Sequence, residues 1–311
     1  MPSKAPWWSV ILCGFLLSGT SSAAKPPDLP MPLGERFAVE IMPAPEEISV
    51  ISPIPMQGNL LGMIASNMAV KRDEALVAPF RDRLLNYSFN SRMREALEST
   101  LPSEGISRAP WFIVADSPRE SLPPEEMPRV PHDALIVVPA YSFDPWFRGL
   151  GVQIDAYVVK RYLKNKGSRL ETQVKFHRRY GFSYSLAIKG KDERIVYWQS
   201  APRPALEKML DTAIQQTVDM LAFDFSTEGR GHWGRSLRMM RFEVDGREYA
   251  GRLLRRGKHW VWALGATQYS SQGGIHYYNF GITGSWMLPD QAAWDAFLLQ
   301  PAQSLPAPDA L

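Results

Sequence analysis

The sequence predicts a fold of the α+β or α/β class, in which a mixed sheet flanked by helices is followed by a small antiparallel β unit. Three observations lead to this prediction. Apolar or alternating runs typical of strands recur up to residue 199, segments with apolar residues at helical spacing interrupt them, and short strands separated by turn residues follow residue 235.

The first half of the chain carries both kinds of pattern. Phe37, Val39 and Ile41 alternate with polar or small residues, which is the period-two pattern of a strand. Leu76 and Phe80 are four residues apart, as on the apolar face of a helix. The expected elements are extended segments at 37–41, 48–55 and 111–116, and helices at 59–86 and 92–101.

The middle of the chain is richest in β pattern. An apolar strand is expected at 134–143, and polar and apolar residues interleave in two further strands at 151–163 and 173–188, with residues 164–169 as a hairpin loop.

The stretch GKDERIVYWQS at 190–200 is interpreted as a turn followed by a strand. Its glycine and charged residues suit a hairpin turn, and residues 195–199 are apolar and aromatic. A helix is predicted at 205–223, because apolar residues form one stripe there and Pro202 and Pro204 precede it.

The C-terminal part changes character. Three short strands are predicted at 239–244, 247–255 and 259–264, with Asp245-Gly246 as a hairpin turn and a further strand or pair at 275–286. The predicted divisions of the chain are a signal peptide (1–24), a proline-rich leader (25–33), an α/β domain (34–225), a linker (226–234), a small β unit (235–288) and a flexible tail (289–311).

The N-terminal residues predict export. Lys4 precedes an apolar core of eleven residues at 7–17, and Ser22-Ala23-Ala24 suits signal cleavage. The core is shorter than the roughly 20 residues of a membrane-spanning helix. We expect a periplasmic or secreted protein that can associate with the outer membrane. Cys13, the single cysteine, leaves with the signal on this reading; lipid attachment at Cys13 is the alternative, although Leu12 does not suit it.

The candidate binding residues lie in the small β unit. Nine basic residues between 230 and 258 outnumber the acidic ones, and tryptophans lie among them, so a basic aromatic face is expected. Burial of the two tryptophans in a core is the competing interpretation. The residues assigned to this face are Arg247, Arg252, Arg255, Arg256, Lys258, Trp260 and Trp262.

Motifs for catalysis are not found in the sequence. The five histidines have no metal-binding spacing, and there is no Gly-x-Ser-x-Gly element, so no catalytic residue, metal or cofactor is assigned. His177 is expected to be an ordinary surface or partly buried residue. Paired carboxylates of a hydrolase could come from an acidic loop and its end, at Asp116, Glu125, Glu126 or Asp133.

The order of elements from 37 to 223 resembles bacterial envelope proteins of the curli-secretion-lipoprotein and TolB-amino-domain type. The residues that carry the resemblance are ALIVVPAYSF, GFSYSLAI, DERIVYWQS and the amphipathic helix that follows. The resemblance implies a non-catalytic role in envelope assembly or transport, and it transfers no functional residue.

We therefore expect an exported, non-enzymatic envelope protein that acts as a binding or assembly accessory. A hydrolase acting on an envelope polymer and an oligomeric scaffold, whose sheet edge pairs with a second copy, are the alternatives. The expected partners are an envelope protein, an anionic lipid or a glycan, and not nucleic acid, because export removes the chain from the cell's nucleic acids.

Overall fold

The structure of the 311-residue chain is a computed structural model. It describes residues 37–45, 48–50, 75–103, 106, 111–114, 133–144, 146–164, 169–186, 188–233, 240–244, 247–256, 260–268 and 280–288. The predicted signal peptide, Cys13, the proline-rich leader and the predicted flexible tail lie outside the described residues, as do the acidic residues 116, 125 and 126.

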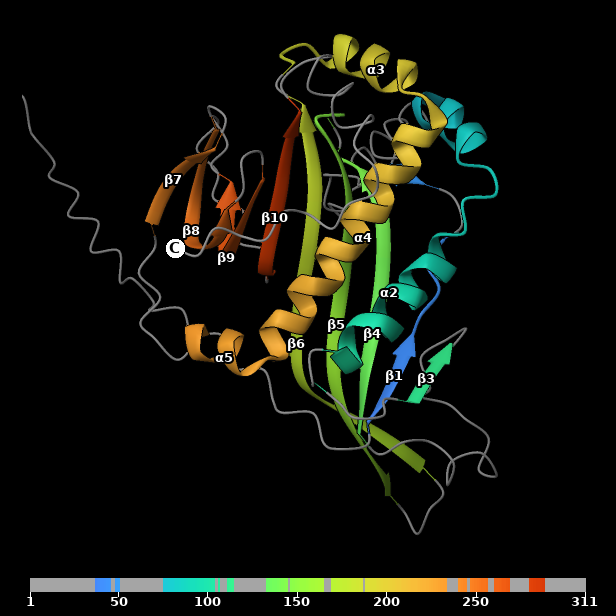
Figure 1. The fold of residues 1–311 in the computed structure, drawn as a ribbon. Helices are drawn as coiled ribbons and strands as arrows, with labels where there is room; N and C mark the ends of the chain where they lie inside the picture. Colours follow the sequence, from blue (N-terminus) through green and yellow to red (C-terminus); the bar gives the residue numbers. More distant parts are fainter. Residues whose placement is uncertain are drawn as a thin grey trace, which may run out of the picture.

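The fold is α+β, as the sequence predicts, and its described strands form one mixed sheet of ten strands. In chain order they are β1 (Ala38–Ile41), β2 (Ser49–Val50), β3 (Trp111–Val114), β4 (Asp133–Phe143), β5 (Gly149–Lys164), β6 (Arg169–Leu186), β7 (Met240–Val244), β8 (Arg247–Arg256), β9 (Trp260–Gln268) and β10 (Phe280–Leu288). Across the sheet the order is β3-β1-β4-β5-β6-β10-β9-β8-β7, with β2 beside β4 (Figure 1).

Strand direction divides the sheet into three parts. Strand β1 is parallel to both β3 and β4, whereas β4, β5 and β6 form an antiparallel meander. Strands β7 to β10 form a second antiparallel series, and β10 pairs in parallel with β6. The C-terminal strands are therefore antiparallel among themselves, as predicted, and they continue the main sheet.

Two helices lie across one face of this sheet, which we call the helix face (Figure 1). They are α2 (Phe89–Ser103) and the long α4 (Arg203–Phe225). Residues 75–83 are also helical. The shorter helices α3 (Lys191–Ser200) and α5 (Thr227–Trp233) precede and follow α4.

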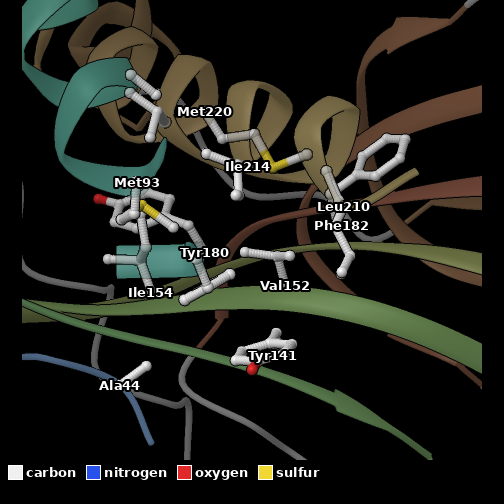
Figure 2. Packing of buried hydrophobic residues seen from close by; sticks show 14 of the residues in the cluster. Ala44, Met93, Tyr141, Val152, Ile154, Tyr180, Phe182, Leu210, Ile214 and Met220 are labelled. Carbon is white, nitrogen blue, oxygen red and sulfur yellow. The ribbon is translucent and has the colours of Figure 1, made fainter. Parts of the chain in front are cut away.

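The hydrophobic core fills the space between α2, α4 and the helix face. Figure 2 shows side chains from the sheet meeting those of the two helices. Alternate residues of β5 and β6 point into the core, because successive side chains of a strand point to opposite faces. The core includes Val152, Ile154, Tyr180 and Phe182 from the sheet, Met93 from α2, and Leu210, Ile214 and Met220 from α4, all of them buried.

The predicted strand at 195–199 is wrong, because residues 191–200 form helix α3. Arg194, Ile195 and Trp198 are buried, and their spacing of three and four residues places them on one side of a helix. Asp192 and Glu193 lie in the first turn, where negative charge is favourable. These tertiary contacts outweigh the strand propensity of Ile-Val-Tyr-Trp, which depends strongly on context.

The stretch predicted as a linker, 226–234, is mostly helical. Ser226 ends α4 by donating its backbone N–H to the carbonyl oxygens of Ala222 and Phe223. Its hydroxyl oxygen then accepts the backbone N–H of Gly229 at 3.1 Å, as an N-cap does for a helix that follows. The division of the chain into domains stays a prediction.

Candidate binding site

The two tryptophans assigned to a binding face lie in the core. Trp260 and Trp262 of β9 are 4% and 2% exposed. The indole Nε1 of Trp262 donates a hydrogen bond of 2.9 Å to Oε1 of Gln216 on α4. The competing interpretation, burial of the pair in a core, therefore describes their position, and the contact with α4 is an addition of the structure.

The three arginines of β8 do not form one basic face. Arg252 and Arg255 lie opposite Leu264 and Trp262 of β9, whose side chains pack in the core. Arg256 lies opposite Val261, whose side chain points to the other face of the sheet. Irregularities on either side of residues 252–253 change the alternation along β8. The remaining assigned residues are Arg247, whose side chain is outside the description, and Lys258, which lies wholly outside it.

The side chain of Arg255 lies on the helix face of the sheet and contacts residues of α4, β9 and α5. Its guanidinium carbon lies 4.8 Å from the ring centroid of Phe223 and 5.1 Å from that of Trp262. Its Nη2 atom is 3.9 Å from the Glu228 carboxylate of α5. These contacts connect β8 to the α4–α5 junction, so this arginine interacts within the fold.

Two arginines of the central strands, one on β5 and one on β6, are neutralised in the interior. The guanidinium of Arg161 donates two hydrogen bonds of 2.7 Å to the carboxylate of Glu40. Arg178 donates to Asp224 at 2.9 Å, and all four side chains are nearly inaccessible to solvent. A count of basic residues along the sequence therefore overstates the positive charge of the surface.

A polar cluster lies on the face of the sheet opposite the helices, and we define it as Asp155, Tyr157, His177 and Arg179. Asp155 is paired with Arg179, and Tyr157 with His177, across the β5–β6 ladder. The Asp155 carboxylate accepts hydrogen bonds from Arg179 Nε (2.9 Å) and Nη2 (2.7 Å), and lies 3.1 Å from His177 Nε2. The rings of Tyr157 and His177 stack at 4.2 Å with 1° between their planes.

The cluster combines hydrogen-bond donors with a carboxylate. Burial and the nearby Asp155 carboxylate raise the pKa of Tyr157, so its hydroxyl stays protonated and can donate. The side chains of His177 and Arg179 are each 33% exposed, and that of Asp155 is 14% exposed. Sequence reasoning places His177 correctly as a surface or partly buried residue but does not find its partners. Asp155 and Tyr157 are two positions apart on β5, and His177 and Arg179 are two positions apart on β6, so each pair shares one face of the sheet.

A second candidate is the turn between β4 and β5, of which residues 144 and 146–149 are described and which we call the Trp146 loop. Asp144 organises it: the carboxylate accepts the backbone N–H of Trp146 at 2.8 Å and also that of Gly149. The Asp144 carbonyl accepts the N–H of Phe147 at 2.9 Å. Such side chain to backbone bonds are typical of aspartate in turns.

Helix α3 fixes the same loop from the other side. Nε of the buried Arg194 donates to the carbonyl oxygen of Trp146 at 2.9 Å, and Nε1 of Trp198 donates to that of Phe147 at 2.8 Å. Phe147 is fully buried and has a φ of 54°, a conformation that a bulky residue adopts rarely. The backbone is thus held while the Trp146 side chain stays 52% exposed.

Sequence reasoning missed the Trp146 loop. The signal lies in Asp144-Pro145-Trp146-Phe147-Arg148-Gly149, where aspartate, proline and glycine mark a turn around two aromatics. Its anchors Arg194 and Trp198 could not be assigned, because their segment was predicted to be a strand.

Of the four carboxylates that the sequence offers for a hydrolase, only one lies among the described residues. Asp133, at the start of β4, is exposed, and the three other carboxylates proposed for a hydrolase lie outside the description. Within the described ranges, no three His, Cys, Asp or Glu side chains are grouped so as to hold a metal. None of the described helices has the length and apolar character needed to cross a membrane.

The chain matches no model of a known protein family, and no curated protein sequence matches it. The resemblance to curli-secretion-lipoprotein and TolB-amino-domain proteins therefore stays a prediction.

Proposed function

We propose that this protein is an exported binding or assembly accessory of the bacterial cell envelope, and that it contacts its partner through the Trp146 loop. The observation that carries the proposal is an exposed tryptophan on a backbone held by Asp144, Arg194 and Trp198. Tryptophan is among the residues that most often dominate binding energy in interfaces. A loop already held in one conformation loses little further entropy on binding.

The test is the retention of the protein in envelope fractions. Trp146→Ala is expected to release the protein into the soluble fraction, whereas Val196→Ala is the matched control. Val196 is also a large exposed apolar residue, 64% accessible, and it lies on α3, the helix that anchors the loop. Equal retention of the wild type and Trp146→Ala would contradict the proposal.

The exported location is tested on the same material. Mass spectrometry of the mature protein is expected to show an N-terminus that begins at Lys25, directly after the predicted cleavage site. If the protein retains residues 1–24 and remains in the cytoplasm, the proposed role in the cell envelope is wrong.

The polar cluster favours a second candidate, a hydrolase acting on an envelope polymer. A histidine bonded to a carboxylate is the arrangement of a general base, and water would then be the nucleophile. His177→Ala is expected to lower the release of soluble fragments from a labelled envelope polymer by about a hundredfold or more. Lys175→Ala, an exposed change on the same strand, is the control, and equal activity of His177→Ala and the wild type would reject this candidate.

A further inference from the structure

We infer that the Trp146 loop binds a sugar ring of an envelope glycan. The inference rests on the proposed function and names the chemistry of the partner at the same loop. It follows from the exposed indole and from the charged residues that belong to the same loop and to the helix that anchors it.

The charged groups come from the loop itself and from the helix that anchors it. Asp144 and Arg148 flank Trp146 in the chain, with Arg148 Nε 3.9 Å from Asp144 Oδ1 and side chains 41% and 30% exposed for the arginine and the aspartate. Lys191 of α3 places its Nζ atom 5.3 Å from the ring centroid of Phe147, the neighbour of Trp146. An exposed aromatic ring and hydrogen-bonding groups of positive and negative charge are thus carried by the Trp146 loop and by α3, which anchors it.

This combination matches the surface of a pyranose. One face of such a ring presents C–H groups, which stack on the face of an aromatic side chain, and the rim carries hydroxyls that both donate and accept hydrogen bonds. A guanidinium donates and a carboxylate accepts, so Arg148 and Asp144 can serve both kinds of rim group.

A protein partner fits the surroundings less well. A contiguous exposed apolar patch of several hundred Å² would mark a site for a protein partner. Val196 is exposed on the helix that anchors the loop, but it follows Arg194 by two positions, about 200° around α3, so it points away from the contact with Trp146. Val138 and Val174, which are also exposed, belong to strands β4 and β6 rather than to the loop.

An anionic membrane surface is also less suitable. Binding to such a surface relies on an excess of lysine and arginine. Around the loop, the positive side chains are Arg148, Lys189, Lys191 and the buried Arg194, and the negative ones are Asp144 and, in the first turn of α3, Asp192 and Glu193, so the excess is a single positive charge. A nearly neutral surrounding with one aromatic platform favours the sugar ring.

The experiment is an isothermal titration of the purified mature protein. The probe is a soluble, peptide-free glycan strand of alternating N-acetylglucosamine and N-acetylmuramic acid. We expect saturable binding that Trp146→Ala weakens by about tenfold or more, and that Trp146→Phe, which keeps an aromatic face, weakens by no more than about threefold. Val196→Ala is expected to bind as the wild type does. Circular dichroism checks that each variant is folded.

The outcomes separate this inference from the proposed function. Absence of saturable binding by the folded wild type, or equal binding by Trp146→Ala, overturns the sugar inference. If Trp146→Ala nonetheless leaves the envelope fraction, the proposed function stands and the partner is not this glycan. If the wild type binds the glycan through Trp146 but envelope retention does not depend on that residue, the sugar site stands and the proposed role of the loop in envelope association fails.

Discussion

The buried ion pair between Arg178 and Asp224 is a residue-scale feature with a large expected effect on stability. Asp224 is inaccessible to solvent and accepts hydrogen bonds from Arg178 and from the Tyr180 hydroxyl. Removing one member leaves the other charge buried without its partner. Asp224→Ala is therefore expected to lower the free energy of unfolding by about 3–5 kcal/mol.

Urea denaturation measures this change. The control is Glu98→Ala, which removes an exposed pair with Arg94 on α2. Exposed pairs of this kind contribute about 0.5 kcal/mol. If the free energy of unfolding falls by a similar amount in the two variants, burial does not make the Asp224 pair more stabilising than an exposed pair.

Buried tyrosines predict a loss of stability in alkali. Burial raises the pKa of Tyr184, and burial together with the Asp224 carboxylate raises the pKa of Tyr180. In the unfolded chain these phenols ionise near pH 10, whereas in the folded protein they stay protonated. The stabilising contribution is complete below about pH 10 and is lost as the pH rises through the range between the unfolded and folded pKa values.

The check is the urea midpoint at pH values from 8 to 11.5. Tyr184→Phe cannot ionise, so its stability is expected to fall less steeply above pH 10 than that of the wild type. Identical slopes in the wild type and Tyr184→Phe would show that Tyr184 does not contribute to the alkaline loss.

At the scale of single residues, the sequence allowed only part of the site to be predicted. The aromatic and basic character of β8 and β9 is visible along the chain, but whether Trp262 faces solvent depends on Gln216 of a helix more than 40 positions earlier. Arg255 likewise changes face because of a local irregularity in β8. Such contacts depend on the three-dimensional arrangement, which spacing along a strand does not contain.

At the scale of elements, the close junction of α4 and α5 makes a direct prediction. A Cβ atom at Gly229 would collide with the carbonyl oxygen of Phe223, whereas one at Gly231, two residues later in α5, would meet nothing within 4 Å. Gly229→Ala is expected to lower the free energy of unfolding by about 1–3 kcal/mol. Gly231→Ala is expected to raise it by up to about 1 kcal/mol, because alanine favours a helix.

Thermal and urea unfolding of the two alanine variants check this prediction. The substitutions are chemically identical and lie in one short helix, so helix propensity alone would move both in the same direction. A stabilised Gly229→Ala would show that α5 can shift away from α4 without loss.

Helix α3 shows why some elements could not be predicted. The expected strands at 134–143, 151–163 and 173–188 are confirmed because long β runs keep one alternation over many residues. The ten residues of α3 are too few for periodicity to distinguish helix from strand. Arg194 and Trp198 bond to loop residues that lie 48 and 51 positions earlier. The same contacts form the Trp146 loop, so one local error concealed the candidate site.

At the scale of the whole molecule, the attachment of β10 predicts one cooperative unfolding transition. Residues Thr283–Leu288 pair with Gly181–Leu186 of β6, and Trp262 bonds to α4. Separation of the C-terminal strands from the rest would break this ladder and expose both tryptophans. We therefore expect the C-terminal strands and the rest of the fold to lose their structure together.

Calorimetry and circular dichroism in the far and near ultraviolet check this prediction. Coincident transitions, with a calorimetric enthalpy equal to the van't Hoff enthalpy, are expected. Two separate transitions would instead support an independent unit at 235–288.

Strand β10 is also the last described strand to leave the ribosome, although its place is between β6 and β9. Until residues 280–288 are synthesised, the outer edge of β6 has no strand beside it, and β7 to β9 cannot be joined to the sheet. The contacts that complete the sheet therefore span about a hundred residues, and contacts so distant along a chain slow folding. A chain exported in an unfolded state would benefit from this delay, since its sheet closes only after residues 280–288 have been made.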